Sequence, residues 1–358
     1  MRRSGVADLP LHQGSCPKWL FERMVKLGRA IGEIVILEYG KDEFLRRISD
    51  PFWFQAFSCV LSFDYHSSGC TTVTCAALKE ALKPEELGIA VLGGKGKASR
   101  KTLEEIEKLA EIFPLTTKRI EQLKYASKMS AKVDNSAVQD GFQLYHHSFI
   151  VTEDGEWAVV QQGMNPSNKY ARRYHWLSEK VSCFVVEPHA AVVCDFRGKV
   201  LNMVAKESEE ARKASVDLIK DNPTHLKKYF SPLFKYLHMQ AEHEIDLTNY
   251  EKLMKSFFQA YEEQPKNFEE LLAVKGIGPK SVRALALLSK LIFGIEASWR
   301  DPAIYSFSHG GKDGTPYFVD RKTYDKSIEV LQAAIEQAEL GKREKIEALK
   351  RLKDFIEI

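Results

Sequence analysis

Apolar positions change their spacing near residue 205, and this change divides the chain into two kinds of structure. Before it, short runs rich in β-branched and aromatic residues alternate with helical segments, which is typical of mixed sheet and helix. We predict strands over residues 59–66, 182–187, 190–196 and 200–205. After it, apolar residues recur at helical spacing. We predict helices over residues 206–220, 224–239, 246–262, 268–273 and 279–293.

The strongest strand signal is a β-hairpin. Residues 141–151 and 156–162 are rich in aromatic and β-branched residues and flank a short acidic turn that ends in glycine. Together these patterns predict an α+β fold class. A mixed α/β domain, the candidate catalytic domain, covers residues 1–205, an all-α region covers 206–300, and a tail covers 301–358.

Two helices are predicted beside the N-terminal strands. One begins at Thr71, after a strand and a small-residue turn, and stops before Pro84. The other covers residues 102–113. Thr102 and Glu105 at its start have the spacing of a capping box, in which each side chain accepts a hydrogen bond from the other residue's amide.

The tail has a pattern of its own. Residues 301–320 are rich in glycine, aspartate and proline, and a connector of this length is usually functional or mobile. Residues 321–356 predict two helices separated at Gly341. The apolar stripe on the first of them includes Leu331 and Ile335, and such a stripe more often packs within one chain than between two. A homodimer is therefore left open.

Composition excludes several classes of protein. Of the 358 residues, 44% are hydrophobic and 28% are charged, which permits a buried core and argues against intrinsic disorder. No run approaches the ~18 apolar residues of a membrane span, and Asp8 and Pro10 interrupt the apolar run that a signal peptide needs. The six cysteines include no Cys-x-x-Cys pair, which argues against a zinc ribbon. We expect a soluble, cytoplasmic protein with free thiols and no membrane partner.

The net charge is only +3, but positive charge is concentrated between residues 93 and 132, which hold ten Lys or Arg and five Glu. A basic surface of this kind attracts polyanions, although a solvated helix face explains the charge equally well. Lys95 and Lys97 lie in a glycine-rich loop that we expect to touch nucleic acid. Its spacing does not match a P-loop and no strong strand precedes it, so ATP hydrolysis is disfavoured.

Residues 268–293 contain the sharpest motif. A short helix leads into Val274-Lys275-Gly276-Ile277-Gly278, and a second helix opens at Pro279. The alternation of apolar residues and glycines resembles the helix-hairpin-helix motif of proteins that bind DNA without sequence preference. Gly276 and Gly278 accept backbone conformations closed to other residues, and Pro279 suits the first helical position.

The amides left unpaired by this turn and helix start form an anion site for one phosphate. Lys275 and Lys280 add positive charge beside it, and Ile277 points inward. We predict that the turn binds the phosphate backbone of DNA whatever the base sequence. The predicted DNA contacts are Lys275, Gly276, Ile277, Gly278, Lys280 and Ser281. A turn used only for helix packing is the alternative.

Candidate chemistry first appears at the end of the strand predicted over 59–66. Asp64 and His66 are two residues apart, so they project from the same face of a strand. The hydroxyl and amide groups that head the next helix follow directly. A carboxylate and an imidazole beside an anion pocket suit metal-assisted or general-base attack on phosphate. A helix cap beside a hydrogen-bonded histidine is the alternative.

A denser polar cluster spans residues 132–189. Its candidate catalytic residues are Asp134, Asp140, His146, His147, Arg172, Arg173, His175, Glu187 and His189. Adjacent strand residues face opposite sides of a sheet, so only one of His146 and His147 can share a face with the neighbours of Asp140. Divalent-metal nucleases need converging carboxylates, and Asp134, Asp140 and Glu187 are the predicted ligands of Mg2+ or Mn2+. Solvated strand faces with ordinary ion pairs are the alternative.

Seven sequence blocks together resemble a known family. They are ADLPLHQG, FDYHSSG, GGKGKASR, AKVDN-x-x-x-QDGFQLYHH, WAVVQQGMN, ARRYHWLSE and EPH. Over nearly its whole length the chain is similar to the domain of unknown function 763 family, which occurs mainly in archaea and thermophilic bacteria. The resemblance implies an N-terminal module paired with a helix-hairpin-helix segment, and a nuclease or DNA-repair role.

Three functions follow. The leading hypothesis is a metal-dependent nuclease that hydrolyses phosphodiesters and is delivered to DNA by the turn at 274–280. The second is a DNA glycosylase or lyase: Lys280 and Asp301 look similar to the reactive lysine and assisting aspartate of helix-hairpin-helix glycosylases. The chain departs from those enzymes in the residues around Asp301 and in lacking a downstream cysteine cluster. The third is a DNA-binding protein without enzymatic activity.

Overall fold

The computed structural model describes residues 16–61, 68–167, 169–194, 197–230, 250–303, 321–338 and 341–356. Within them, an antiparallel sheet of five strands has the order β1-β3-β4-β5-β6. Its strands are β1 (Ile89–Lys95), β3 (Gln143–Thr152), β4 (Trp157–Asn165), β5 (Tyr170–Leu177) and β6 (Ala191–Val193). A separate small pair joins β2 (Val138–Gln139) to β7 (Leu201–Asn202). The α+β class is confirmed.

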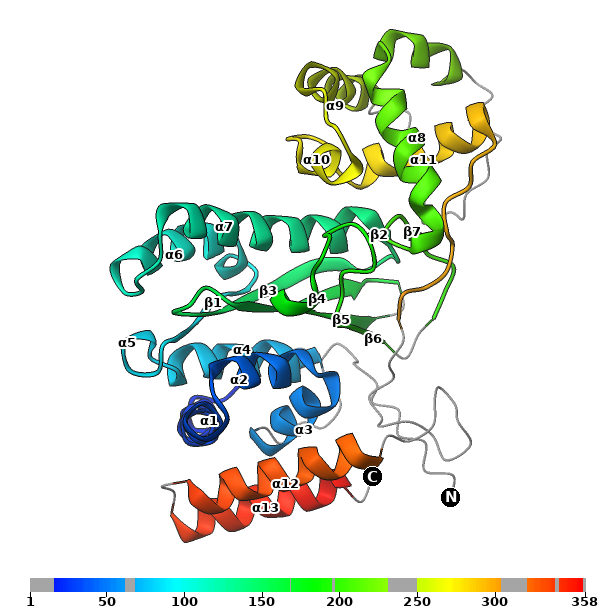
Figure 1. Cartoon of the computed structure of the whole chain (residues 1–358). Helices are drawn as coiled ribbons and strands as arrows, with labels where there is room; N and C mark the ends of the chain where they lie inside the picture. The colour runs from blue at the N-terminus through cyan, green and yellow to red at the C-terminus, as the bar shows by residue number, and fades with distance from the viewer. Residues whose placement is uncertain are drawn as a thin grey trace, which may run out of the picture.

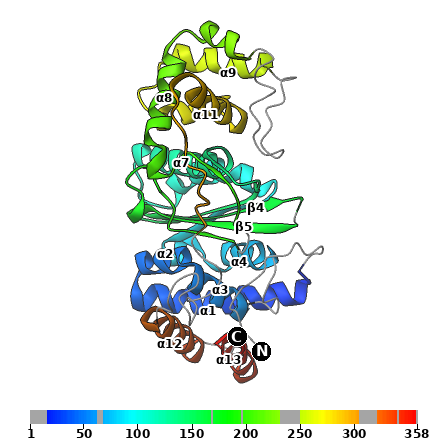
Figure 2. The ribbon, with the colours of Figure 1, turned by 90° about the vertical axis from the view of Figure 1, so that its right-hand side faces the viewer.

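Helices cover both faces of the sheet (Figure 1). One face is covered by α1 (Lys18–Tyr39), α2 (Lys41–Ser49), α3 (Pro51–Leu61), α4 (Ser68–Ala81) and α5 (Pro84–Leu87). The other face is covered by α6 (Thr102–Lys108) and α7 (Thr117–Lys132). Beyond α7 lies a helical lobe of α8 (Glu209–Lys220), α9 (Tyr250–Glu263), α10 (Phe268–Ala273) and α11 (Pro279–Phe293). Figure 2 shows the same stack of layers from the side.

The sheet separates two hydrophobic cores because alternate residues of each strand face opposite sides. On β3, Phe149 and Val151 enter the core beneath α7, which continues into the helical lobe. Ile150, between them, enters the core formed with α1 to α4. We call these sides the α7 face and the α4 face. Every strand residue discussed below belongs to one of them.

The C-terminal tail packs against the N-terminal helices. Its helices α12 (Arg321–Gln337) and α13 (Lys342–Ile356) pack on α1 and α3, at the bottom of Figure 1. Leu331 and Ile335 are fully buried in the core of the α4 face, so the predicted stripe packs within the chain. The break at Gly341 is confirmed. The remainder of the predicted connector, 304–320, lies outside the described residues.

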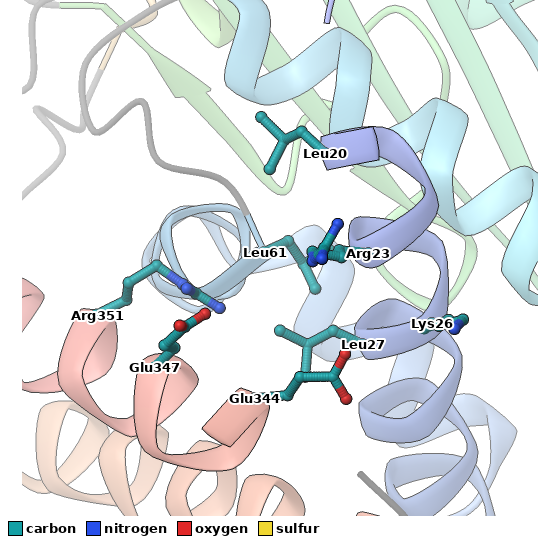
Figure 3. Close-up of a pocket in the computed structure, with 8 residues that line it drawn as sticks. All are labelled: Leu20, Arg23, Lys26, Leu27, Leu61, Glu344, Glu347 and Arg351. Atoms are coloured by element: carbon teal, nitrogen blue, oxygen red, sulfur yellow. The ribbon is translucent and has the colours of Figure 1, made fainter. Parts of the chain in front are cut away.

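A small cavity lies between α1, α3 and α13 (Figure 3). Its volume of about 30 Å³ accommodates a water molecule or two but no substrate. Leu27 and Leu61 line it together with the charged side chains of Glu344 and Arg351. We interpret it as a packing gap between helices.

Local patterns predicted several elements well. The hairpin is confirmed as β3 and β4, and the helices expected at 268–273 and 279–293 match α10 and α11. The strand over 59–66 is wrong where the structure describes it, because Cys59–Leu61 form the last turn of α3. All residues of α3 are buried, so no polar face reveals its helical period.

Other strand predictions need correction. Residues 182–187 form turns, the strand at 190–196 shrinks to β6, and the strand at 200–205 shrinks to β7. A strand does precede the glycine-rich basic loop, since β1 ends at Lys95. The capping box is also wrong: Thr102 Oγ1 donates to Ser99 O, and the Glu105 carboxylate accepts from Gly93 N instead.

No helix among the residues that the structure describes is long and apolar enough to cross a lipid bilayer.

Candidate functional site

The two faces of the sheet divide the candidate residues of the 132–189 cluster between them. Asp134, Asp140, His147, Arg172 and His189 belong to the α7 face, where they contact one another or α7. His146, Arg173 and His175 belong to the α4 face. The prediction that His146 and His147 face opposite ways is therefore confirmed.

A continuous hydrogen-bond chain runs through the α7 face. Ser127 Oγ lies 2.9 Å from His147 Nε2, and His147 Nδ1 lies 2.9 Å from Gln161 Oε1. Gln161 Nε2 donates to Asp134 Oδ2 at 2.5 Å. Because the Gln161 oxygen can only accept, we assign the His147 proton to Nδ1 and make Ser127 the donor to Nε2.

Asp134 is the hub of this chain. It lies in a π-helical turn, Val133–Ala137, that continues α7, and its side chain is fully buried. Trp176 Nε1 donates to Oδ2 at 2.9 Å, and His189 Nε2 bonds to Oδ1 at 2.5 Å. Burial raises the pKa of Asp134, while the His189 and Trp176 hydrogen bonds oppose that rise.

Of the side chains linked by these hydrogen bonds, that of His189 lies nearest to solvent. Its residue is partly exposed, whereas Ser127, His147, Gln161 and Asp134 are buried. With Nε2 bonded to Asp134, Nδ1 is the ring nitrogen of His189 that makes no hydrogen bond among the described residues. A carboxylate that orients an imidazole in this way is the arrangement of a general base. Sequence reasoning named both residues but could not pair them.

Asp140 belongs to an ion-paired group instead. Arg172 Nη1 lies 2.9 Å from Asp140 Oδ2, and the same guanidinium binds both carboxylate oxygens of Asp301. Tyr174 Oη donates to Asp140 at 2.6 Å. Asp301 also accepts from Gly198 N. These contacts fasten the segment after α11 to the sheet.

The predicted metal ligands do not converge. Asp134 binds Gln161, Trp176 and His189, and Asp140 binds Arg172 and Tyr174. Glu187 is exposed and forms an ion pair with Lys206 at 3.1 Å. Within the described ranges, no three His, Cys, Asp or Glu side chains are grouped to hold a metal ion. The structure therefore does not bring these three carboxylates together, because separate partners hold each of them.

Lys280 and Asp301, the two residues that look similar to those of a glycosylase, lie in different surroundings. Lys280 is exposed at the start of α11, whereas the Asp301 carboxylate is bonded to Arg172. Asp301 therefore acts as a structural anchor for the segment that follows α11. Asp64 and His66, the other predicted catalytic pair, lie outside the described residues.

The α4 face carries its own buried polar side chains. Arg173 contacts Thr71 Oγ1 at 3.3 Å and Gln55 Oε1 at 3.2 Å, and it stacks on the Phe54 ring. His175 Nδ1 lies 3.0 Å from Ile48 O, and burial holds its pKa well below the usual value. Burial, together with His147 and Lys95, lowers the pKa of His146 to about 3. Both histidines are therefore neutral at pH 7.

The turn between α10 and α11 has the form that the sequence predicts. Val274 and Ile277 are buried, while Lys275, Gly276 and Lys280 are exposed. Gly276 has φ +94°, a conformation that L side chains rarely adopt. The inward position of Ile277 is confirmed by its place in the core of the α7 face.

The two glycine amides of this turn, Gly276 N and Gly278 N, are not used in hydrogen bonds of the described residues. The first helical bond of α11 runs from Val282 N to Gly278 O, so the amides of Lys280 and Ser281 lack a partner within the helix. A Cβ placed on Gly278 would meet nothing within 4 Å. The backbone here is thus open to a ligand.

Several side chains fix the turn to the sheet domain. Lys132 Nζ donates to Leu272 O and Val274 O, and Lys128 Nζ donates to Ala273 O. These lysines satisfy the last carbonyls of α10, where a helix dipole favours cations. They belong to the basic stretch 93–132, so part of its charge is used inside the protein.

The exposed charge of that stretch lies mainly in the loop after β1. Lys95, Lys97, Arg100 and Lys101 are exposed, and no salt bridge of the described residues includes any of them. By contrast, Lys124 binds Glu107 and Glu121.

Comparison with known proteins gives one family. The family model described as a protein of unknown function (DUF763) matches residues 5–319. The chain belongs to the DUF763 family. No curated protein and no solved structure gives a match.

In this DUF763 chain, sequence reasoning missed the uncharged side chains that connect the charged ones. Ser127, Gln161 and Trp176 complete the chain around Asp134, and Gln162 joins the α4 face. Gln161 and Gln162, consecutive glutamines in an otherwise apolar strand, could have indicated such partners in the sequence, since buried amides must form hydrogen bonds.

Proposed function

We propose that this DUF763 protein binds polynucleotides through the turn at Val274–Ser281, as a helix-hairpin-helix motif does. The observation that carries the proposal is the backbone of the exposed Gly276 and the half-buried Gly278, whose amides have no acceptor among the described residues. Backbone amides at a helix start bind phosphate oxygens well, because the helix dipole favours negative charge there.

The charges around the turn support the same ligand. Lys275 and Lys280 flank the amides, are exposed, and form no salt bridge within the part of the chain that the structure describes. Lys95 and Lys97 remain predicted contacts on a second basic surface, at the end of β1. Contacts of this kind read phosphate and sugar, so the affinity depends on salt and not on base sequence.

Fluorescence anisotropy with labelled DNA duplexes of unrelated sequence tests this proposal. We expect equal affinities for all sequences and a linear fall of log K with log salt. Lys275→Glu should weaken binding about tenfold or more for every sequence, since a repulsive charge replaces a phosphate contact. Lys266→Glu is the matched control, because Lys266 is an exposed lysine just before α10, away from the turn. Equal losses in both variants would refute the proposal.

The Asp134–His189 pair favours a second candidate function, hydrolysis of phosphodiesters. The His189 imidazole is 7% exposed and bonds to a fully buried carboxylate, an arrangement that suits a base activating a water molecule. In this candidate DNA is cleaved by His189 as base, and Mg2+ or Mn2+ would serve as an added cofactor that stabilises the phosphate charge.

Incubation of the full chain with single- and double-stranded DNA, in Mg2+, Mn2+ or EDTA, tests the second candidate. We expect His189→Gln to abolish cleavage while leaving DNA binding unchanged. His225→Gln is the control, since His225 is exposed and its imidazole bonds to Asp221. Cleavage that survives in His189→Gln would exclude this pair as the catalytic base.

A further inference from the structure

Four polar side chains form one row across the sheet on the α4 face. Lys95 on β1 lies opposite His146 on β3, His146 lies opposite Gln162 on β4, and Gln162 lies opposite Arg173 on β5. Residues directly opposite in antiparallel strands share a face and lie within about 5.5 Å of each other at Cβ. Lys95 is exposed and the other three are buried, so the row leads from solvent into the protein.

The start of α4 lies over this row. Gln162 Nε2 donates to the carbonyl of Ser68, the first residue of α4, at 2.9 Å. Arg173 Nη1 donates to Thr71 Oγ1 one turn further on. The first amides of a helix have no partner within it, and its N-terminus carries partial positive charge. Arg173 and the α4 N-terminus therefore place positive charge over the buried end of the row, and Lys95 adds its charge at the solvent end.

An irregularity in β3 adds a hydroxyl at the same point. The pairing of β3 with β4 shifts between Leu144 and His146, which leaves Tyr145 as the extra residue of a bulge. Bulges turn a side chain to a new direction and occur often beside active sites. Tyr145 Oη accepts from Gln162 Nε2 at 2.5 Å, and Lys95 Nζ lies 5.8 Å from the centre of its ring.

Two polar atoms in the row have no partner within the described part of the chain. They are His146 Nδ1 and Gln162 Oε1, on side chains that are 1% and 0% exposed. An unpaired buried polar atom destabilises the protein and calls for an explanation such as a ligand. Gln162 Nε2 donates to Ser68 O, so the carboxamide with the unpaired oxygen lies beside the first residue of α4.

We propose that this point is a binding site for hydrogen phosphate or a phosphate monoester. The anionic oxygens would contact Lys95, Arg173 and the first amides of α4. The P–OH group would donate to Gln162 Oε1, which needs a donor and not a second acceptor. A phosphodiester within a nucleic-acid strand has no P–OH group. The site therefore selects a terminal phosphate or a free phosphate. The inference does not depend on the turn at 274–281, with which the site shares no residue.

Thermal unfolding of the full chain at pH 7 tests the site, with inorganic phosphate as the probe and chloride at equal ionic strength as the reference. Phosphate should raise Tm in a concentration-dependent manner, as a ligand of the folded state does. Lys95→Met should remove at least half of this shift. Lys108→Met is the matched control, since Lys108 is an exposed lysine on α6 outside the row. No shift beyond that of chloride, or equal losses in the two variants, would overturn the proposal.

The same measurement identifies the source of the phosphate. If the site accepts any phosphate monoester, adenosine monophosphate and a dinucleotide with a 5′ phosphate should both raise Tm. If it accepts free nucleotides, adenosine monophosphate alone should raise Tm. A dinucleotide with a 5′ hydroxyl should have no effect, and an equal effect would exclude selection for a monoester. Lys275→Glu must keep the phosphate response, so failure of the DNA-binding proposal would be seen separately.

Discussion

Lys132 Nζ lies 2.7 Å from the carbonyl oxygen of Val274, the first residue of the turn proposed to bind phosphate. The lysine comes from α7, which packs on the sheet, so this bond connects the turn to the α/β part of the protein. Gln139, at the end of the same chain segment, donates to Pro279 O at 2.8 Å on the other side of the turn. The turn is thus positioned by the sheet domain.

Stability should increase between pH 8 and pH 10 through Lys132. Burial, with the nearby charge of Lys128, lowers the pKa of Lys132 to about 8. An unfolded lysine holds its proton up to about pH 10.4, so the unfolded state binds more protons in this window and stability rises with pH. Urea unfolding at pH 8 and pH 9.5 should show the wild type gaining stability relative to Lys132→Met. A constant difference between them would contradict the assignment.

His147 should destabilise the protein in mild acid. Burial lowers its pKa to about 4, opposed by the Gln161 hydrogen bond. The unfolded imidazole binds a proton near pH 6.5, so stability is complete above that pH and is lost as pH falls towards 4. The loss attributable to His147 is roughly 3 kcal/mol, because each pKa unit corresponds to about 1.4 kcal/mol. Denaturant unfolding from pH 7 to pH 4.5 should show a shallower decline in His147→Gln.

Replacement of Arg172 should be strongly destabilising. Its guanidinium is fully buried between Asp140 and Asp301, and its loss leaves two buried carboxylates without their cation. Removing one partner of a buried ion pair costs about 3–5 kcal/mol. Urea unfolding of Arg172→Leu measures this, with Arg300→Leu, an exposed arginine of the same segment, as the control. Equal stability of the two variants would show that the Arg172 group is not structural.

The two glycines of the turn should respond differently to alanine. Gly276 has φ +94°, and its added Cβ would lie 3.1 Å from Ser256 Oγ, so Gly276→Ala should cost about 1–2 kcal/mol of stability as well as affinity. Gly278 has φ −141°, and its Cβ would meet open space. Gly278→Ala should therefore keep stability within about 0.5 kcal/mol but weaken DNA binding, because the methyl group occupies the phosphate position. Unchanged DNA affinity of a folded Gly278→Ala protein would count against phosphate binding there.

Features set by neighbouring residues could be predicted from the sequence, and those set by distant ones could not. The turn at 274–278 needs only its glycines, its proline and the apolar Ile277, so its form and its two helices were predicted closely. β5 was not predicted, because two arginines in its centre resemble a solvated segment. They are buried because Arg172 binds Asp301 and Arg173 binds Gln55, more than 100 positions away along the chain.

In the candidate site, too, the features set by neighbouring residues could be predicted and those set by distant residues could not. Alternation along β3 correctly separated His146 from His147, since the period of a strand is local. The partners of Asp134 come from β4, β5 and the loop before β6, and nothing in the spacing of Asp134, Asp140 and Glu187 shows that each carboxylate is held separately.

Amide NMR of the glycines tests the central claim most directly. The full chain, labelled with 15N at glycine, would be titrated with a short DNA duplex of arbitrary sequence, and the signals of Gly276 and Gly278 assigned by their Ala variants. The account predicts that these two amides shift most, and that the shifts disappear as salt is raised. Large shifts at other glycines while Gly276 and Gly278 stay unchanged would contradict it.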